Sequence, residues 1–158
     1  MKAYRASLLY FAANSARAEF EEDGLLVVGP NAQGRQVVQA IGSYQNLSAA
    51  WPGVAVEHLP GRIIAPGFVD MHIHYPQLDV IGSPAEGLLP WLENYTFPHE
   101  SRFSDASYGE ESARFFIDEL LRNGVTTALT FATSHPASVD ALLGEAQKRK
   151  LRMIAGKV

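Results

Sequence analysis

Residues 66–74 read Pro66-Gly67-Phe68-Val69-Asp70-Met71-His72-Ile73-His74, and this stretch decides the fold. It is a mostly apolar run behind a Pro-Gly turn, which predicts a β-strand. Side chains alternate along a strand, so Asp70, His72 and His74 project from one face. Two imidazoles at positions i and i+2 can reach one metal ion, each at about 2.0–2.1 Å. The stretch therefore predicts a strand that carries half of a metal site.

A His-x-His pair also arises by chance in half-buried strands. Two features favour the metal interpretation here: the apolar strand that leads into the pair, and the long connection that follows it, residues 75–106. Connections of this length inside a compact domain are usually functional. Within this one, residues 87–97 are expected to form a short helix.

Regular elements follow. Ser107-x-x-Glu110 reads as a capping box that opens a helix through Arg122, with Phe115, Phe116, Leu120 and Leu121 near one face and Asn123-Gly124 at its end. Residues 125–131 form a predicted strand, residues 137–149 a helix and residues 151–155 another strand.

The order strand, helix, strand, helix, strand predicts right-handed βαβ units in a parallel sheet. A closed (β/α)8 barrel needs about 250 residues. The fold class is therefore α/β, the start of a TIM-type (β/α)8 barrel over residues 66–158. We expect the chain to be a fragment of a longer protein.

Residues 1–65 read as a separate β-rich portion, with predicted strands at 6–11, 24–28 and 36–41 and a less regular stretch at 46–54. The strands at 24–28 and 36–41 are expected to pair as a hairpin, because Gly29-Pro30-Asn31 between them is a strong turn signal. So few short strands do not make an independently stable sheet. This portion is therefore expected to be part of a small β-sandwich domain.

The composition, 47% hydrophobic and 19% charged over 158 residues, is ordinary for a globular protein. With no cysteine, thiolate metal sites are excluded and His, Asp and Glu remain as ligands. The net charge of −4 argues against nucleic acid as a partner. No signal peptide or membrane-length apolar run is visible, so a cytoplasmic protein without a membrane partner is expected.

The stretch Pro66–His74 resembles the first barrel strand of the amidohydrolase superfamily, behind that superfamily's N-terminal β-sandwich portion. The resemblance implies that strands from the far C-terminus of the full-length protein complete the small β domain. Further segments are similar to guanine deaminases: residues 72–77, 89–98, 122–128, 131–135 and the closing Gly156-Lys157-Val158. The most specific of them is Trp91-Leu92-x-x-Tyr95-Thr96-Phe97-Pro98.

This resemblance implies one zinc ion per subunit, held by His72, His74, two histidines from later strands and an Asp near the last strand. It implies hydrolytic deamination of guanine to xanthine and ammonia, with a Glu from a later strand as proton shuttle, in a homodimer. Beyond the two metal ligands no catalytic group is expected within residues 1–158. The chain alone is therefore expected to be inactive.

Gln77 is the main substrate-binding candidate. It lies three residues after His74, where guanine deaminases place such a glutamine, and its amide offers both donors and an acceptor to a purine edge. His74 could also line the pocket. Trp91 and Phe97 could form a wall of that pocket or pack in the core.

Other polar residues have structural interpretations. Asp70 could hydrogen-bond near the histidines or satisfy backbone amides. His135 is expected to precede a helix that starts at Pro136, and His58 and His99 are expected at the surface. Lys157 receives no role.

Two alternatives remain open. Another amidohydrolase deaminase could act on cytosine, a thiopurine, an oxidised guanine or an aminotriazine, using the same histidines without Gln77. The chain could also be a non-catalytic module. Two imidazoles suit iron as well as zinc.

Overall fold

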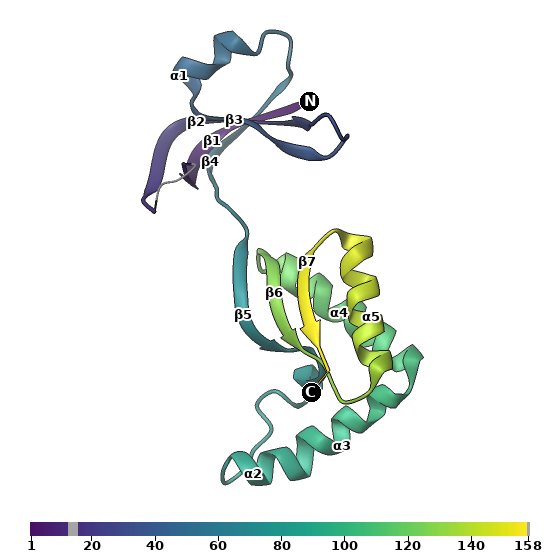
Figure 1. Cartoon of the computed structure of the whole chain (residues 1–158). Coiled ribbons are helices and arrows are strands. Elements are labelled where there is room, and N and C mark those ends of the chain that lie inside the picture. Colours follow the sequence, from purple (N-terminus) through teal and green to yellow (C-terminus); the bar gives the residue numbers. More distant parts are fainter. Residues whose placement is uncertain (13–15, 158) are drawn as a thin grey trace. The chain divides into compact units, whose positions relative to one another are not determined.

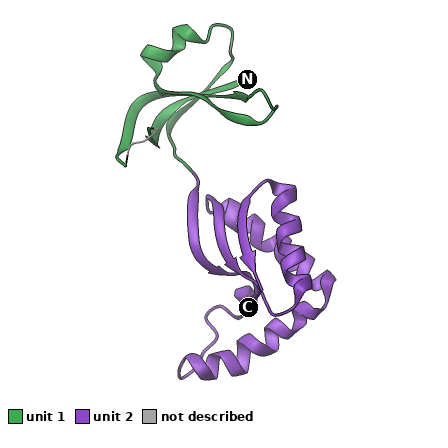
Figure 2. Cartoon of the chain, in the orientation of Figure 1, with its two compact units in different colours: residues 1–66 green, residues 67–158 purple. Residues whose placement is uncertain are grey.

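The computed structural model describes residues 1–12 and 16–157; the Val158 of the closing tripeptide lies outside the described residues. The chain divides into two compact units, residues 1–66 and residues 67–158 (Figures 1 and 2). No helix within the described ranges is long and apolar enough to span a membrane.

The first unit contains a four-stranded sheet with the order β3-β2-β1-β4. Its strands are β1 (Lys2–Phe11), β2 (Ala18–Pro30), β3 (Gln36–Ser43) and β4 (Val56–Ile64). β1 pairs antiparallel with β2, β2 antiparallel with β3, and β1 parallel with β4. The predicted hairpin is confirmed as β2–β3, and each predicted strand lies inside a longer observed one.

β4 is the strand that the sequence did not indicate. Pro60 and Gly61 interrupt it, and seven of its nine residues are exposed, so it lacks the alternation that marks a half-buried strand. The irregular stretch before it holds helix α1 (Tyr44–Leu47) and the 3-10 turn η1 (Ser48–Ala50).

Buried side chains in this unit form a small core on one face of the sheet. Ala3, Leu25 and Val27 are buried, and α1 and the residues after it pack against them through Tyr44, Leu47, Trp51 and Val54. Large apolar side chains elsewhere on this sheet stay exposed, among them Phe11, Phe20 and Val38. The sheet thus leaves much apolar surface open, and its place in a small β-sandwich domain stays a prediction.

The second unit confirms the predicted order of strands and helices. Its elements are β5 (Phe68–His74), α4 (Ala106–Arg122), β6 (Val125–Phe131), α5 (Pro136–Arg149) and β7 (Arg152–Gly156). The three strands form a parallel sheet in the order β5-β6-β7. Helices α4 and α5 cover one face of it (Figure 1).

The core of this unit lies between the sheet and the two helices. Buried side chains from α4, α5 and β6 meet there, including Phe116, Ile117, Leu120, Ala128 and Leu142. The predicted apolar face of α4 was partly wrong, because Phe115 is 55% and Leu121 39% exposed. Ala113 and Ile117 complete the buried stripe instead, at the spacing that helix geometry requires.

The start of α4 also differs from the prediction. The N-cap is Asp105, whose Oδ1 accepts hydrogen bonds from the backbone N and the Oγ of Ser107, at 2.9 and 2.8 Å. Ser107 thus donates within the first turn and does not cap the helix. The capping box was wrong because Asp105, two residues earlier, offers a stronger acceptor.

The long connection between β5 and α4 is a chain of short helical turns. They are η2 (Tyr75–Val80), α2 (Leu88–Trp91), the π-helical η3 (Leu92–Thr96), α3 (Phe97–Glu100) and η4 (Ser101–Ser104). The expected helix at 87–97 is confirmed and continues further. Tyr75 and Phe103 are buried, and the ring of Tyr75 packs against the rings of Phe103 and Phe116, which ties the connection to the core.

His99 corrects another expectation, because it is buried with 9% exposure whereas His58 is exposed as predicted. Its Nε2 lies 3.1 Å from the hydroxyl oxygen of Tyr108, and that hydroxyl donates to Asp79 at 3.0 Å. These bonds join the connection to α4. The sequence could not show this, since the surroundings of His99 include Tyr108, nine residues later in α4.

Candidate metal and substrate site

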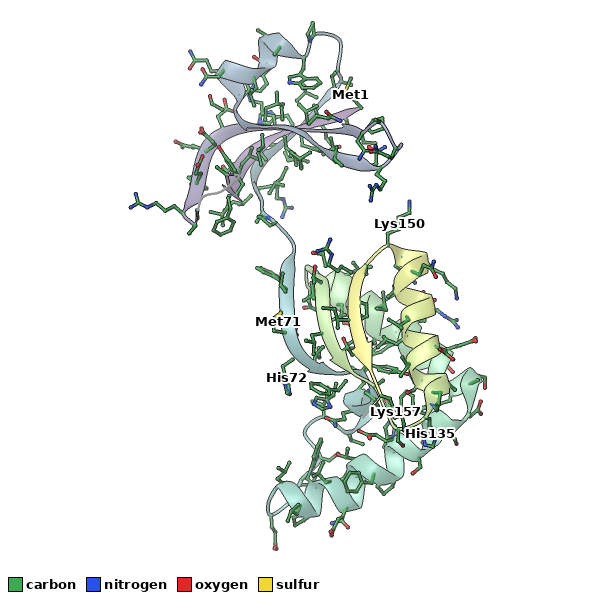
Figure 3. The ribbon with its side chains drawn as sticks, in the orientation of Figure 1. Met1, Met71, His72, His135, Lys150 and Lys157 are labelled. Carbon is green, nitrogen blue, oxygen red and sulfur yellow. The ribbon has the colours of Figure 1, made fainter. Side chains whose placement is uncertain are left out.

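His72 and His74 lie at the carboxyl end of β5, on one face of the strand. Their ring centroids are 5.3 Å apart. Ile73, between them, packs against the core on the opposite face. The histidines therefore project from the sheet face that α4 and α5 leave uncovered. In Figure 3 the labelled His72, His135 and Lys157 lie at the same end of the sheet.

The surroundings of His74 favour its neutral form. Partial burial lowers its pKa, and the nearby His72 lowers it further, whereas Glu100 acts in the opposite direction. A neutral imidazole has a lone pair for a metal ion. Nδ1 of His74 lies 3.3 Å from Nε2 of Gln77, so the ring's Nε2 is the nitrogen left for an ion.

Phe131 is a neighbour of both histidines that the sequence analysis did not single out. It ends β6 and pairs in register with His74. Its ring stacks on His74 with centroids 4.6 Å and planes 16° apart, and its centroid is 5.0 Å from that of His72. The available signal was its position, at the carboxyl end of the neighbouring parallel strand.

Gln77 contacts His74, and it has a second partner. Its Nε2 donates to Oε1 of Glu100 at 3.2 Å. Glu100 ends α3, two residues beyond the Trp91–Pro98 segment, and was not predicted as a site residue. The long connection thus brings the carboxylate of Glu100 close to Gln77 and His74.

Asp70 satisfies a backbone amide, which was one of its two expected roles. Its Oδ1 accepts from the backbone N of His72 at 3.0 Å. His135 immediately precedes α5, as expected, and its carbonyl accepts from the backbone N and the Oγ of Ser138.

Trp91 is half-buried and Phe97 is 55% exposed. Within the described residues, neither ring forms a ring pair with His72 or His74 or a hydrogen bond to Gln77. Thr96, in the π-helical turn, buries its Oγ1 without a hydrogen-bond partner. π-Helical turns are frequent at functional sites. Phe97 does not pack in the core, so that interpretation of it was wrong.

Across residues 1–12 and 16–157, no three His, Asp or Glu side chains cluster closely enough to hold a metal ion. The histidines are therefore a pair without further ligands in this part of the structure. Lys157 is exposed and has no hydrogen bond or ion pair there.

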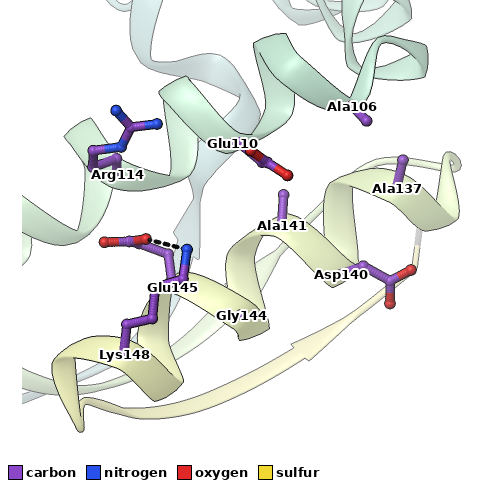
Figure 4. Close-up of a pocket in the computed structure, with 9 residues that line it drawn as sticks. All are labelled: Ala106, Glu110, Arg114, Ala137, Asp140, Ala141, Gly144, Glu145 and Lys148. Carbon is purple, nitrogen blue, oxygen red and sulfur yellow. Dashed lines mark hydrogen bonds and ion pairs between the residues drawn. The ribbon is translucent and has the colours of Figure 1, made fainter.

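A hollow of about 260 Å³ lies between α4 and α5 (Figure 4). Two of its charged lining residues form an ion pair, Glu145 with Lys148 at 3.3 Å. Since the helices cover the sheet face opposite the histidines, this hollow belongs to the packing of the two helices.

A parallel strand-helix-strand sheet with two imidazoles at the carboxyl end of its first strand defines a class, the TIM-type α/β barrel proteins with chemistry at that end. Comparison with known proteins narrows this class. The Amidohydrolase family model matches residues 63–158, more than half of the sequence, and the chain belongs to that family.

Individual relatives share one activity in their names. Guanine deaminase of Escherichia coli (strain K12) is 49% identical over 140 residues, which cover 88% of this chain and 31% of that protein. The structure of E. coli guanine deaminase superposes with a TM-score of 0.89 at 42% identity, covering 99% of this chain and 37% of that one.

A third match is the crystal structure of guanine deaminase from C. acetobutylicum with guanine bound in its active site. It has a TM-score of 0.82 and 29% identity, and the alignment covers 98% of this chain and 35% of that one. This chain therefore spans about a third of the length of the relatives that it matches.

Proposed function

We propose that the full-length protein is a zinc-dependent hydrolase that deaminates guanine to xanthine and ammonia. The observation that carries the proposal is the trio His72, His74 and Gln77, held together at the carboxyl end of β5. It lies in a chain 49% identical to a guanine deaminase over most of its length.

The histidines fit a metal ion by their shared face, and His74 also by its lowered pKa and its free Nε2. His72 and His74 would hold zinc together with two histidines and an Asp from later strands. Those ligands and the proton-shuttling Glu would lie in the two thirds of the relatives' length that this chain does not span. When bound, zinc supplies Lewis acidity that makes hydroxide available near neutral pH.

Gln77 and His74 would bind guanine, with Trp91 as a further wall of the pocket. The amide of Gln77 matches a purine edge that presents hydrogen-bonding groups. Its position three residues after His74 would place the substrate beside the metal. The guanine-bound relative from C. acetobutylicum supports guanine as the substrate.

The rest of the protein follows from the same likeness. Residues 1–65 would belong to a small β-sandwich and residues 66–158 would form the first strands and helices of the barrel. The protein would act as a cytoplasmic homodimer with one zinc per subunit, with guanine rather than nucleic acid or a membrane as its partner.

The test uses the purified full-length protein. Guanine consumption, followed by ultraviolet absorbance, should match ammonia release, and elemental analysis should find one zinc per subunit. Cytosine, a thiopurine, an oxidised guanine and an aminotriazine run in parallel. If one of these compounds is turned over while guanine is not consumed, guanine is the wrong substrate. If the protein contains one iron per subunit in place of zinc, zinc is the wrong metal.

A further inference from the structure

The side chain of Gln77 lies between two partners that come from different parts of the second unit. Its Nε2 is 3.2 Å from Oε1 of Glu100 and 3.3 Å from Nδ1 of His74. Glu100 lies 23 residues further along the chain, and both residues are half-buried. The hydrogen bond between Gln77 and Glu100 therefore holds the far part of the long connection next to the site.

Glu100 decides which end of the Gln77 amide faces it. An ionised carboxylate only accepts hydrogen bonds, so it requires the amino end of the amide. A flipped amide would set two oxygens against each other at about the same distance. With Nε2 held in this way, Oε1 of Gln77 is the end left over, and no donor of the described residues reaches it.

His74 is a conditional partner of the same amide. Its Nδ1 accepts a hydrogen bond only while that nitrogen carries no hydrogen. A neutral imidazole that uses Nε2 as a metal ligand carries its hydrogen on Nδ1. The bond to His74 is then lost, and Glu100 remains as the partner that fixes Gln77.

We propose that Glu100 is a positioning and specificity-determining residue, which holds the amino group of Gln77 so that its carbonyl Oε1 is presented to substrate. A carbonyl accepts hydrogen bonds, so it matches the N1–H and the 2-amino group of guanine. Purines that lack a donor at this edge leave the carbonyl unpaired and bind less well. The inference rests on the proposed function, because it takes Gln77 as a guanine-binding residue.

The test is a double-mutant cycle in the full-length enzyme, with Glu100→Ala, Gln77→Ala and the two combined. Glu100→Ala should raise KM for guanine about tenfold, the usual effect of losing a hydrogen bond to a charged group, with a smaller change in kcat. Zinc content should not change. In the double variant the rise in KM should not exceed that of Gln77→Ala alone, because Glu100 acts through Gln77.

Two further variants separate positioning from structure. Glu100→Gln retains an acceptor for Gln77 and should recover part of the lost affinity, and it covers the case in which Glu100→Ala does not fold. Glu93→Gln is the matched control, because Glu93 is an exposed carboxylate in η3 with no bond in the described part of the chain. It should leave KM unchanged.

The outcomes are distinguishable. Independent, multiplying losses in the double variant, or unchanged guanine kinetics in Glu100→Ala, would overturn the role of Glu100. Loss of zinc in Glu100→Ala would also overturn it, because Glu100 would then act by supporting the metal ligand His74. If Gln77→Ala binds guanine normally, the proposed substrate role of Gln77 fails first, and this inference fails with it.

Discussion

The ring of Phe131 stacks on the ring of His74, with centroids 4.6 Å and planes 16° apart. The two residues are partners in the parallel pairing of β5 and β6, and His72 lies 5.0 Å from the same phenyl ring. Side chains paired across neighbouring strands restrict each other's rotamers. Phe131 therefore restricts both imidazoles before any ion is bound.

Replacing Phe131 with leucine should weaken zinc binding by the full-length protein about two- to tenfold, the range that the energy of an aromatic pair allows. The leucine keeps the site apolar but no longer stacks on His74, so the rings must be ordered when the ion binds. Competition with a chelator measures the affinity. Phe115→Leu, at an exposed phenylalanine of α4, serves as the control. Equal affinities for both variants would contradict a role for the stack.

Local patterns were enough to predict the histidine pair, but not its neighbours. The alternation of a strand is a property of consecutive residues, so the shared face of His72 and His74 followed from residues 68–74 alone. Phe131 reaches the site through the register of β5 and β6, and Glu100 reaches it through the path of the connection between β5 and α4. Neither of these can be read from local sequence. The same limit applies to the burial of His99.

His72→Ala should abolish zinc retention and guanine turnover in the full-length protein. The remaining His74 cannot replace an imidazole that contributes a ligand bond, and the mutation adds no new donor. Metal content after dialysis and activity with added zinc measure the two effects. Gly87→Ala, at a position where an added methyl group meets open space, is the control. An active variant that retains zinc would eliminate His72 as a ligand.

The cap of α4 gives a dependence of stability on pH. Hydrogen bonds from the side chain and backbone of Ser107 lower the pKa of the Asp105 carboxyl below its usual range. A carboxyl with a lowered pKa in the folded state stabilises the protein above its unfolded pKa, about 3.9, and this contribution is lost as pH falls through the folded value.

Asp105→Asn keeps a capping acceptor but cannot titrate. Wild-type protein should therefore melt at a higher temperature than this variant at pH 7, and the difference should shrink as the pH falls below about 4. Thermal unfolding across that range measures it. A constant difference between the two proteins at all pH values would show that the charge of Asp105 does not stabilise α4.

Two glycine substitutions should change the stability of the second unit in opposite directions. At Gly67, just before β5, an added Cβ would lie 2.0 Å from Oγ1 and 2.3 Å from Cγ2 of Thr126. Threonine is short and branched, so its atoms cannot move aside without shifting β6. Gly67→Ala should therefore cost about 1–3 kcal/mol, the usual effect of overpacking.

At Gly144, within α5, an added Cβ meets no atom within 4 Å. Alanine there restricts the unfolded chain and favours the helix, so Gly144→Ala should add about 0.5–1 kcal/mol. Denaturant unfolding of the full-length protein measures both variants. If Gly67→Ala were as stable as wild type, the close approach of Gly67 to Thr126 would not constrain the start of β5, and the histidines would depend on other contacts for their position.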